Sequence, residues 1–213
     1  KPEEIRDKKI LVTKNPFGRF PYELAKLGYN VEFLEKIYVY LLTIDYLYNY
    51  SKKEGDIVCP RIHSFCSSFT EKSVTKQHKI PDVDIKGDLI KDNKYQNIKV
   101  LQEDFIKYYK GKKDLYDCVI TVYASEDVVN TVEYIEIIYN ILKKGGIWIN
   151  LTNLNNNYAD YGGYALTWDE MREVILNYGF EFKREEKQVV PYLNIEGHSL
   201  PHTVGMVLAT VIK

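Results

Sequence analysis

The residues best placed to do chemistry lie at positions 13–19, where the sequence TKNPFGR follows a short aliphatic run. The aliphatic run predicts a buried strand, and the apolar residues from Phe20 onwards have the spacing of a helix. In a doubly wound α/β fold, backbone N–H groups of this first strand-to-helix turn bind a nucleotide-like cofactor, and glycines allow its close approach. Gly18 is the one glycine here, while Pro16 has no N–H group and Phe17 carries a bulky ring. The turn therefore predicts a cofactor-binding fold in which the cofactor site is partly filled, with Phe17 in the place of the cofactor's tail.

Acidic residues follow two other predicted strands. Residues 30–34 predict the second strand, which ends at Glu35, and Asp104 follows a strand predicted over residues 98–101. In α/β cofactor folds, an acid at such a strand end binds the hydroxyl pair of a ribose. A solvated glutamate that caps the next helix is an equally direct interpretation of Glu35. Both acids are therefore candidates for a cofactor site, with helix capping as the alternative for Glu35.

The rest of the chain alternates between predicted strands and helices. Strands are predicted at residues 118–122 and 147–151, helices at residues 21–27, 128–143 and 167–178, and extended segments at residues 180–188 and 204–212. This order predicts an α/β fold: a Rossmann-like class I methyltransferase sheet, mostly parallel with an antiparallel C-terminal strand, and with helices on both faces.

Two stretches depart from this alternation. Residues 37–50 are apolar almost all round, which predicts a helix that is buried on more than one side. Residues 58–97 show no lasting period and predict an irregular insertion, of the kind that forms lids or binding loops. At 213 residues the chain is expected to form a single domain, residues 1–213, that contains this insertion.

The composition narrows the class of protein. With 29 basic and 30 acidic residues, no overall attraction to nucleic acid or membrane is expected. Three scattered cysteines favour a reducing compartment over a disulfide framework, and no signal peptide or long apolar run is found. We therefore expect a cytoplasmic protein without a membrane partner.

Several strings of the sequence resemble one known family in order and spacing. They are ELAKLGY, RIHSF, PDVDI, EDF, YDCVITV, NTVEYIEIIYNILKKGGIWINL and NYGFEF. Together they extend over nearly the whole chain from residue 9. The chain resembles the carnosine N-methyltransferase family, S-adenosylmethionine-dependent enzymes that methylate an imidazole nitrogen of a dipeptide.

The resemblance implies a cofactor site that is half retained. The family's glycine-rich turn looks like PGAGLGR, so its first two glycines fall on Lys14 and Pro16 here. The methionine end of the cofactor, which carries the transferable methyl group, therefore meets the most altered part of the site. The cofactor-binding residues that the resemblance implies are Gly18, Arg19, Glu35, Asp104 and Phe105.

The substrate side departs further from the family pattern. The family's aspartate after the fourth strand falls on Glu126, its histidine on Val129, and the two tyrosines of its last strand on His202 and Val204. N-methylation requires a nucleophile held in line with the methyl group. The changes therefore predict that imidazole methylation is lost and that no catalytic residue remains.

A basic run at residues 107–113, KYYKGKK, has a composition that can contact phosphates and stack on bases. The alternative is a solvated helix end. The candidate nucleic-acid contacts in this run are Lys107, Tyr108, Lys110, Lys112 and Lys113.

Four residues of the sequence could in principle bind a metal. Cys59, His63, Cys66 and His78 are all possible zinc ligands, but their spacing matches no closed structural pattern. We expect no metal, and we expect His63 to be a packed or hydrogen-bonded side chain.

Two functional hypotheses follow. The favoured one is a catalytically degenerate methyltransferase-fold protein that uses no cofactor and acts as a binding or regulatory factor, with a ribonucleoprotein such as the ribosome as its partner. The alternative is an active S-adenosylmethionine-dependent N-methyltransferase for a histidine-containing dipeptide or a related small substrate, in which Lys14 pairs with the cofactor's carboxylate.

Overall fold

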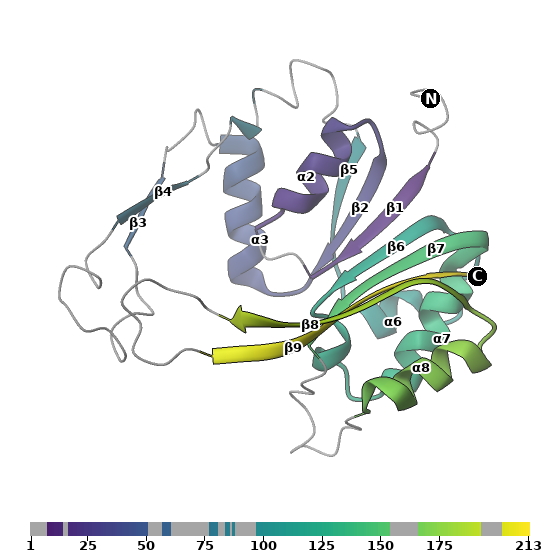
Figure 1. The fold of residues 1–213 in the computed structure, drawn as a ribbon. Coiled ribbons are helices and arrows are strands. Elements are labelled where there is room, and N and C mark those ends of the chain that lie inside the picture. Colours follow the sequence, from purple (N-terminus) through teal and green to yellow (C-terminus); the bar gives the residue numbers. More distant parts are fainter. Residues whose placement is uncertain are drawn as a thin grey trace.

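A seven-stranded sheet forms the centre of the molecule (Figure 1). The computed structural model describes residues 8–14, 17–50, 57–60, 77–80, 84–85, 87, 97–153, 166–192 and 202–213. The strands of the sheet are β1 (Lys9–Thr13), β2 (Asn30–Glu35), β5 (Ile98–Gln102), β6 (Tyr116–Val122), β7 (Leu142–Thr152), β8 (Glu181–Tyr192) and β9 (His202–Ile212). Their order is β5-β2-β1-β6-β7-β9-β8; the first five are parallel, and β9 runs antiparallel to both of its neighbours. This arrangement confirms the predicted class I methyltransferase sheet.

Helices cover both faces of the sheet, and the two groups stand on opposite sides in Figure 1. One group is α2 (Arg19–Lys26) and α3 (Tyr38–Asp45), which continues into a π-helical turn, η1 (Tyr46–Tyr50). The other group is α6 (Phe105–Tyr109), α7 (Thr131–Ile141) and α8 (Trp168–Asn177), with a short 3₁₀ turn, η4 (Ser125–Asp127), ahead of α7. Among the described residues, no helix is long and apolar enough to cross a membrane.

Alternation along the central strands divides the apolar core in two. Ile10 and Val12 of β1 pack with the α2 and α3 residues, whereas Leu11 between them packs with those of α6, α7 and α8. All three are at most 5% exposed. A parallel strand that is covered on both faces must be apolar throughout, which is the pattern that predicted β1 and β6.

The boundary between α7 and β7 differs from the predicted one. The helix ends at Ile141 and the strand begins at Leu142, so the predicted helix over residues 128–143 was too long at both ends. Gly145 and Gly146, which follow the predicted helix, belong to the strand, where Gly145 donates its N–H to the carbonyl of Lys213 (2.9 Å). Lys143, the last residue of the predicted helix, lies in β7 and forms an ion pair with Asp117 (2.8 Å). Pairing with distant strands therefore outweighed the local helical pattern.

The helix predicted over residues 37–50 forms, but the prediction that it is buried on more than one side was wrong. Ile44 and Leu47 face the core, while Tyr38 and Leu42 are more than half exposed. An apolar sequence all round is compatible with one buried face, because the opposite face is not obliged to be polar.

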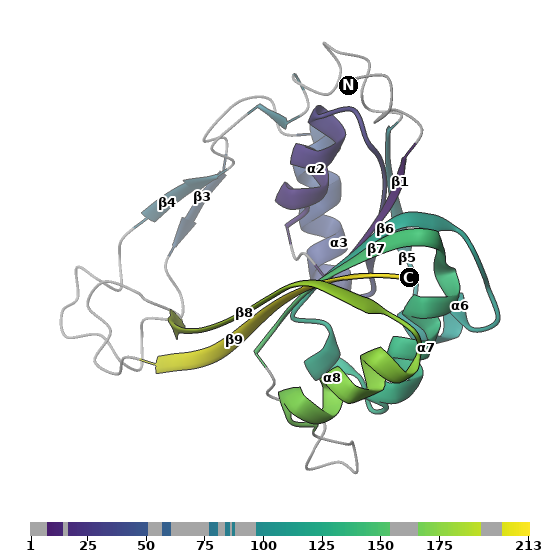
Figure 2. The same ribbon diagram turned by 45° about the vertical axis from the view of Figure 1, so that its right-hand side comes forward.

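The predicted irregular insertion at residues 58–97 contains a two-stranded antiparallel ribbon, β3 (Ile57–Pro60) and β4 (Gln77–Ile80). Figure 1 and Figure 2 show this ribbon away from the centre of the sheet. Most of the insertion lies outside the described residues. The single-domain expectation stays a prediction.

Candidate functional site

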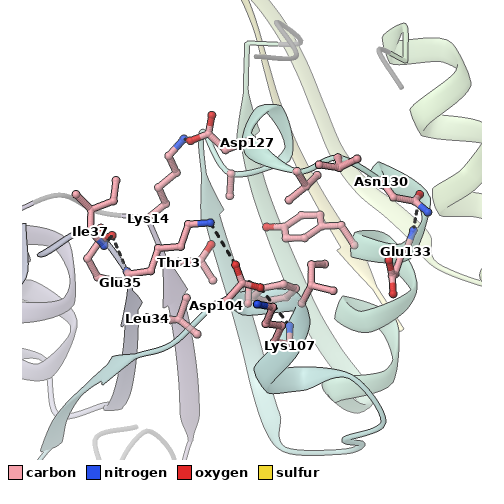
Figure 3. A pocket seen from close by; sticks show the side chains of 17 residues that line it. Thr13, Lys14, Leu34, Glu35, Ile37, Asp104, Lys107, Asp127, Asn130 and Glu133 are labelled. Carbon is pink, nitrogen blue, oxygen red and sulfur yellow. Dashed lines mark hydrogen bonds and ion pairs between the residues drawn. The ribbon is translucent and has the colours of Figure 1, made fainter. Parts of the chain in front are cut away.

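A pocket of about 420 Å³ opens at the carboxyl ends of β1, β2, β5 and β6 (Figure 3). The chain order reverses at this edge, because β2 and β5 extend the sheet on one side of β1 and β6 extends it on the other. Such a reversal leaves a crevice in which open α/β sheets bind ligands. The volume is in the range of small-molecule sites.

Glu35 lies at the end of β2 and is 4% exposed. Its Oε1 accepts the backbone N–H groups of Lys36 (2.7 Å) and Ile37 (2.8 Å), which lie just ahead of the first turn of α3. Its Oε2 is buried and has no hydrogen-bond partner among the described residues. The capping alternative for Glu35 was wrong, because the side chain is buried and bonds to N–H groups ahead of α3 instead of to those of its first turn. Its other oxygen is left for a donor that the described residues do not supply. The neighbouring Thr13 Oγ1 is buried and without a partner in the same described set.

Asp104 forms the adjoining wall, where β5 passes into α6. Its Oδ1 accepts the N–H of Lys107 (3.2 Å) and caps α6, while Lys36 Nζ donates to Oδ2 (3.2 Å). Burial acts to raise the pKa of Asp104, but these two partners outweigh it and leave the pKa below the ordinary value. The carboxylate is therefore ionised at neutral pH and is fixed in direction by the helix it caps.

The rest of the pocket wall is largely apolar. Phe105 packs against Tyr134 with ring centroids 4.8 Å apart, and both residues line the pocket. Leu34, Ile106 and Val128 add aliphatic surface. Fixed carboxylates beside an apolar wall suit a ligand that combines a flat apolar ring with hydroxyl donors.

Lys14 closes the side of the pocket next to β6. Its backbone has φ 57°, in the left-handed region that favours glycine. Its Nζ donates to the carbonyl oxygen of Tyr123 (2.6 Å). The same Nζ forms an ion pair with Asp127, which the upper part of Figure 3 shows. Tyr123 also has a positive φ, 51°, so two strained residues meet at this point.

Two predicted cofactor-binding residues of the turn do not line the pocket. Gly18 and Arg19 are absent from the described residues that line it. Gly18 accepts the hydroxyl of Tyr48 (2.6 Å), and a Cβ there would lie 2.8 Å from that oxygen, so the glycine serves the packing of α2 against η1. Arg19 pairs with Glu23 one helical turn further on (2.7 Å).

Phe17, which was expected to fill the cofactor site, is not among the described residues that line the pocket. Its ring is 53% exposed and contacts Tyr40 edge-on, with centroids 5.7 Å apart. Pro16 lies outside the described residues. Lys14 is instead the residue of this turn that closes the pocket; the signal was its place at a glycine position of the family pattern.

The basic run at residues 107–113 surrounds the end of α6. Lys107 lines the pocket, and Lys110 pairs with Glu133 (2.9 Å). Lys112 lies over the ring of Tyr108, 3.1 Å from its centroid. Lys113 is exposed. Part of this run is therefore engaged within the chain, and its role in nucleic-acid contact stays a prediction.

The possible metal ligands are only partly described. The backbone register of β3 and β4 places Cys59 opposite His78, while His63 and Cys66 lie outside the described residues. Within the part of the chain that the structure describes, no group of three or more metal-ligating side chains forms. The expectation of no metal stays a prediction.

The sheet order, with a pocket at its switch point and acids at the ends of β2 and β5, defines the class I methyltransferase fold. A structure of this class, an S-adenosylmethionine dependent methyltransferase from Mesorhizobium loti, matches 99% of this chain and 93% of its own with a TM-score of 0.59 and 12% identity.

The sequence comparison is more specific. The model of the carnosine N-methyltransferase family matches residues 1–203, and the chain belongs to this family. It is 32% identical over 161 residues to "Carnosine N-methyltransferase unmet" of Drosophila melanogaster, covering 75% of this chain and 34% of the relative. It is 29% identical over 195 residues to the carnosine N-methyltransferase of Rattus norvegicus, covering 90% of this chain and 48% of the relative. The chain thus spans between a third and a half of the length of these relatives.

Proposed function

We propose that this chain binds the adenosyl part of S-adenosylmethionine-type ligands in the pocket, and that it acts as a ligand-binding or regulatory member of its family without transferring methyl groups. Two parts of the pocket support the two halves of this proposal: the Glu35 side supports nucleoside binding, and the Lys14 side opposes binding of a methyl donor.

The observation that carries nucleoside binding is the unpartnered Oε2 of Glu35. Burying a carboxylate oxygen without a donor costs about 1–3 kcal/mol, or more for a charged group. A ribose hydroxyl supplies such a donor, and an adenine ring can lie along the apolar wall near Phe105. The residues on this side therefore suit the nucleoside half of S-adenosylmethionine.

The methionine half fits less well. When bound, S-adenosylmethionine supplies an electrophilic methyl group on a sulfonium, and its amino-acid tail must be held so that this group points at a nucleophile. The ammonium of Lys14 already bonds to the two acceptors on the other side of the pocket, the carbonyl of Tyr123 and the carboxylate of Asp127. Val129, which takes the position of the family's histidine, lines the pocket with an apolar side chain that has no donor or acceptor.

The second candidate is an active N-methyltransferase, which the family membership favours. One pair of measurements separates the candidates. Isothermal titration with adenosine tests the pocket, and mass spectrometry after incubation with S-adenosylmethionine and carnosine tests the chemistry. We expect adenosine to bind in the micromolar range and no methylated product to form. Product in excess of the protein would establish the enzyme instead.

Asp104→Asn provides the variant for the titration. Asparagine retains the N-cap of α6 but removes the charge beside the pocket, so the fold is kept while adenosine affinity falls. Equal affinity in the wild type and the variant would place the nucleoside elsewhere.

A binding factor also needs a partner, and we propose a ribonucleoprotein, on the composition of residues 107–113. Co-sedimentation of the purified chain with ribosomes is expected to decrease when Lys107 and Lys113 are replaced by glutamate. A chain that stays in the supernatant would remove this partner and leave the nucleoside proposal intact.

A further inference from the structure

We propose that Lys14 makes the pocket select adenine nucleosides with an uncharged 5′ substituent over those that carry an amino-acid tail. The inference rests on the proposed nucleoside binding and adds a rule for the ligand's other end. The ligand class is that of adenosine and 5′-methylthioadenosine, as opposed to S-adenosylmethionine and S-adenosylhomocysteine.

Lys14 is bound by two acceptors. Its Nζ is held by one carbonyl oxygen, that of Tyr123, and by one carboxylate, that of Asp127. A carbonyl oxygen and a carboxylate are also the acceptors that an α-ammonium group requires. The protein's own ammonium therefore occupies a cation site in the wall of the ligand pocket.

This cation site lies in the wall of the pocket. Thr13, Lys14 and Asp127 line the same pocket as Glu35 and Asp104, and in Figure 3 the Lys14–Asp127 pair lies on a different side of the pocket from Asp104. A nucleoside bound by Glu35 extends its 5′ substituent into the remainder of the pocket. A substituent with an ammonium group then approaches an ammonium that is already in place.

Both contacts of the Lys14 ammonium stabilise its position. Both groups of the pair are about one-third exposed, so the ion pair is only partly screened by water. The bond from a charged donor to the Tyr123 carbonyl is short, 2.6 Å. Displacing an ammonium from one charge-assisted hydrogen bond lowers the affinity of the displacing ligand by roughly ten- to a hundredfold. We expect a preference of that size.

The backbone of Lys14 provides a suitable variant. Because its φ of 57° is one that glycine adopts freely, Lys14→Gly removes the ammonium and relieves the strained conformation together. Lys14→Met removes the charge while keeping a long apolar chain. Lys144→Met, at an exposed position of β7 outside the pocket, removes one charge as the matched control.

Isothermal titration of these proteins with 5′-methylthioadenosine and with S-adenosylmethionine tests the rule. The wild type and Lys144→Met are expected to bind 5′-methylthioadenosine at least about tenfold more tightly than S-adenosylmethionine. In Lys14→Gly and Lys14→Met the affinity for S-adenosylmethionine is expected to rise about tenfold or more, with little change for 5′-methylthioadenosine. The ratio of the two affinities is the readout, so a general loss of folded protein does not imitate the result.

Two results would overturn the inference alone. One is equal or tighter binding of S-adenosylmethionine by the wild type. The other is weaker binding of S-adenosylmethionine by both Lys14 variants, which would mean that Lys14 pairs with the ligand's carboxylate. If the wild type binds none of the three ligands (5′-methylthioadenosine, S-adenosylmethionine and adenosine), the proposed function on which the inference depends is overturned instead.

Discussion

Replacing Glu35 by glutamine tests the nucleoside site at the atom that defines it. The carboxylate Oε1 is already used by two backbone N–H groups, so only Oε2 is available to a ligand. Glutamine retains an oxygen for the N–H groups and places an amide nitrogen, which is a donor, where Oε2 stood. The variant therefore removes one charge-assisted acceptor from the pocket and leaves an acceptor for the N–H groups of Lys36 and Ile37 in place.

The size of the effect follows from this single contact. One hydrogen bond to a charged group contributes about 1.5–3 kcal/mol, which corresponds to a loss of adenosine affinity of roughly 10- to 150-fold. In the absence of ligand, two effects on stability oppose each other: a buried charge is removed, but the bonds to the N–H groups weaken. We expect the free energy of unfolding without ligand to change by less than about 1 kcal/mol.

A double cycle with 2′-deoxyadenosine identifies the partner of Oε2. In the wild type, removal of the ligand's 2′-hydroxyl is expected to lower the affinity about as much as Glu35→Gln does. In the variant, the same removal is expected to have little further effect, because both changes break one contact. Isothermal titration supplies all four affinities, and Glu103→Gln, an exposed acid outside the pocket, is the control.

The reasoning is refuted if the two effects add without coupling, or if wild-type protein binds adenosine and 2′-deoxyadenosine equally. Either result would mean that Oε2 does not contact the ribose 2′-hydroxyl.

Two further predictions concern Tyr116 and Asp117, the first two residues of β6. The hydroxyl of Tyr116 donates to Glu32 and shares a 2.7 Å hydrogen bond with the buried Tyr109. Tyr116→Phe should therefore lower the free energy of unfolding in urea by about 2–4 kcal/mol, against about 1 kcal/mol for Tyr109→Phe. Equal losses for the two variants would contradict this. For Asp117, burial acts to raise the pKa, but the ammonium of Lys143 and further donors outweigh it and lower the pKa below the ordinary value. The stability that Asp117 contributes is therefore present above the unfolded pKa and lost as the pH falls through the folded pKa, so Asp117→Asn should destabilise the protein above about pH 5 and progressively less in acid; a pH-independent difference in thermal unfolding would contradict this.

The fold followed from the sequence to a large extent because its signals are local or strictly periodic. Continuous aliphatic runs predicted β1 and β6, since a strand covered on both faces must be apolar throughout. Thr167 and Glu170 form a full capping box, which depends on four consecutive residues and was therefore predictable.

The two acids of the site, Glu35 and Asp104, could also be predicted from the sequence. The carboxyl ends of parallel strands lie at one edge of a sheet, so acids that follow two neighbouring strands lie near each other, as they do after β2 and β5. Glu35 and Asp104 accordingly line one pocket, together with the predicted Phe105.

Tertiary structure alone decided what the other side of the pocket contains. Lys14 and the Tyr123 carbonyl are 109 positions apart, and no local pattern indicates that they meet. The end of α7 at Ile141 was decided in the same way, by pairing of Leu142 with Tyr116 across the sheet. The sequence by itself determined the elements and the acids at their ends, because those depend on neighbouring residues and on strand direction. Which side chain closes the pocket depended on the order in which distant strands assemble, and that is a property of the folded sheet.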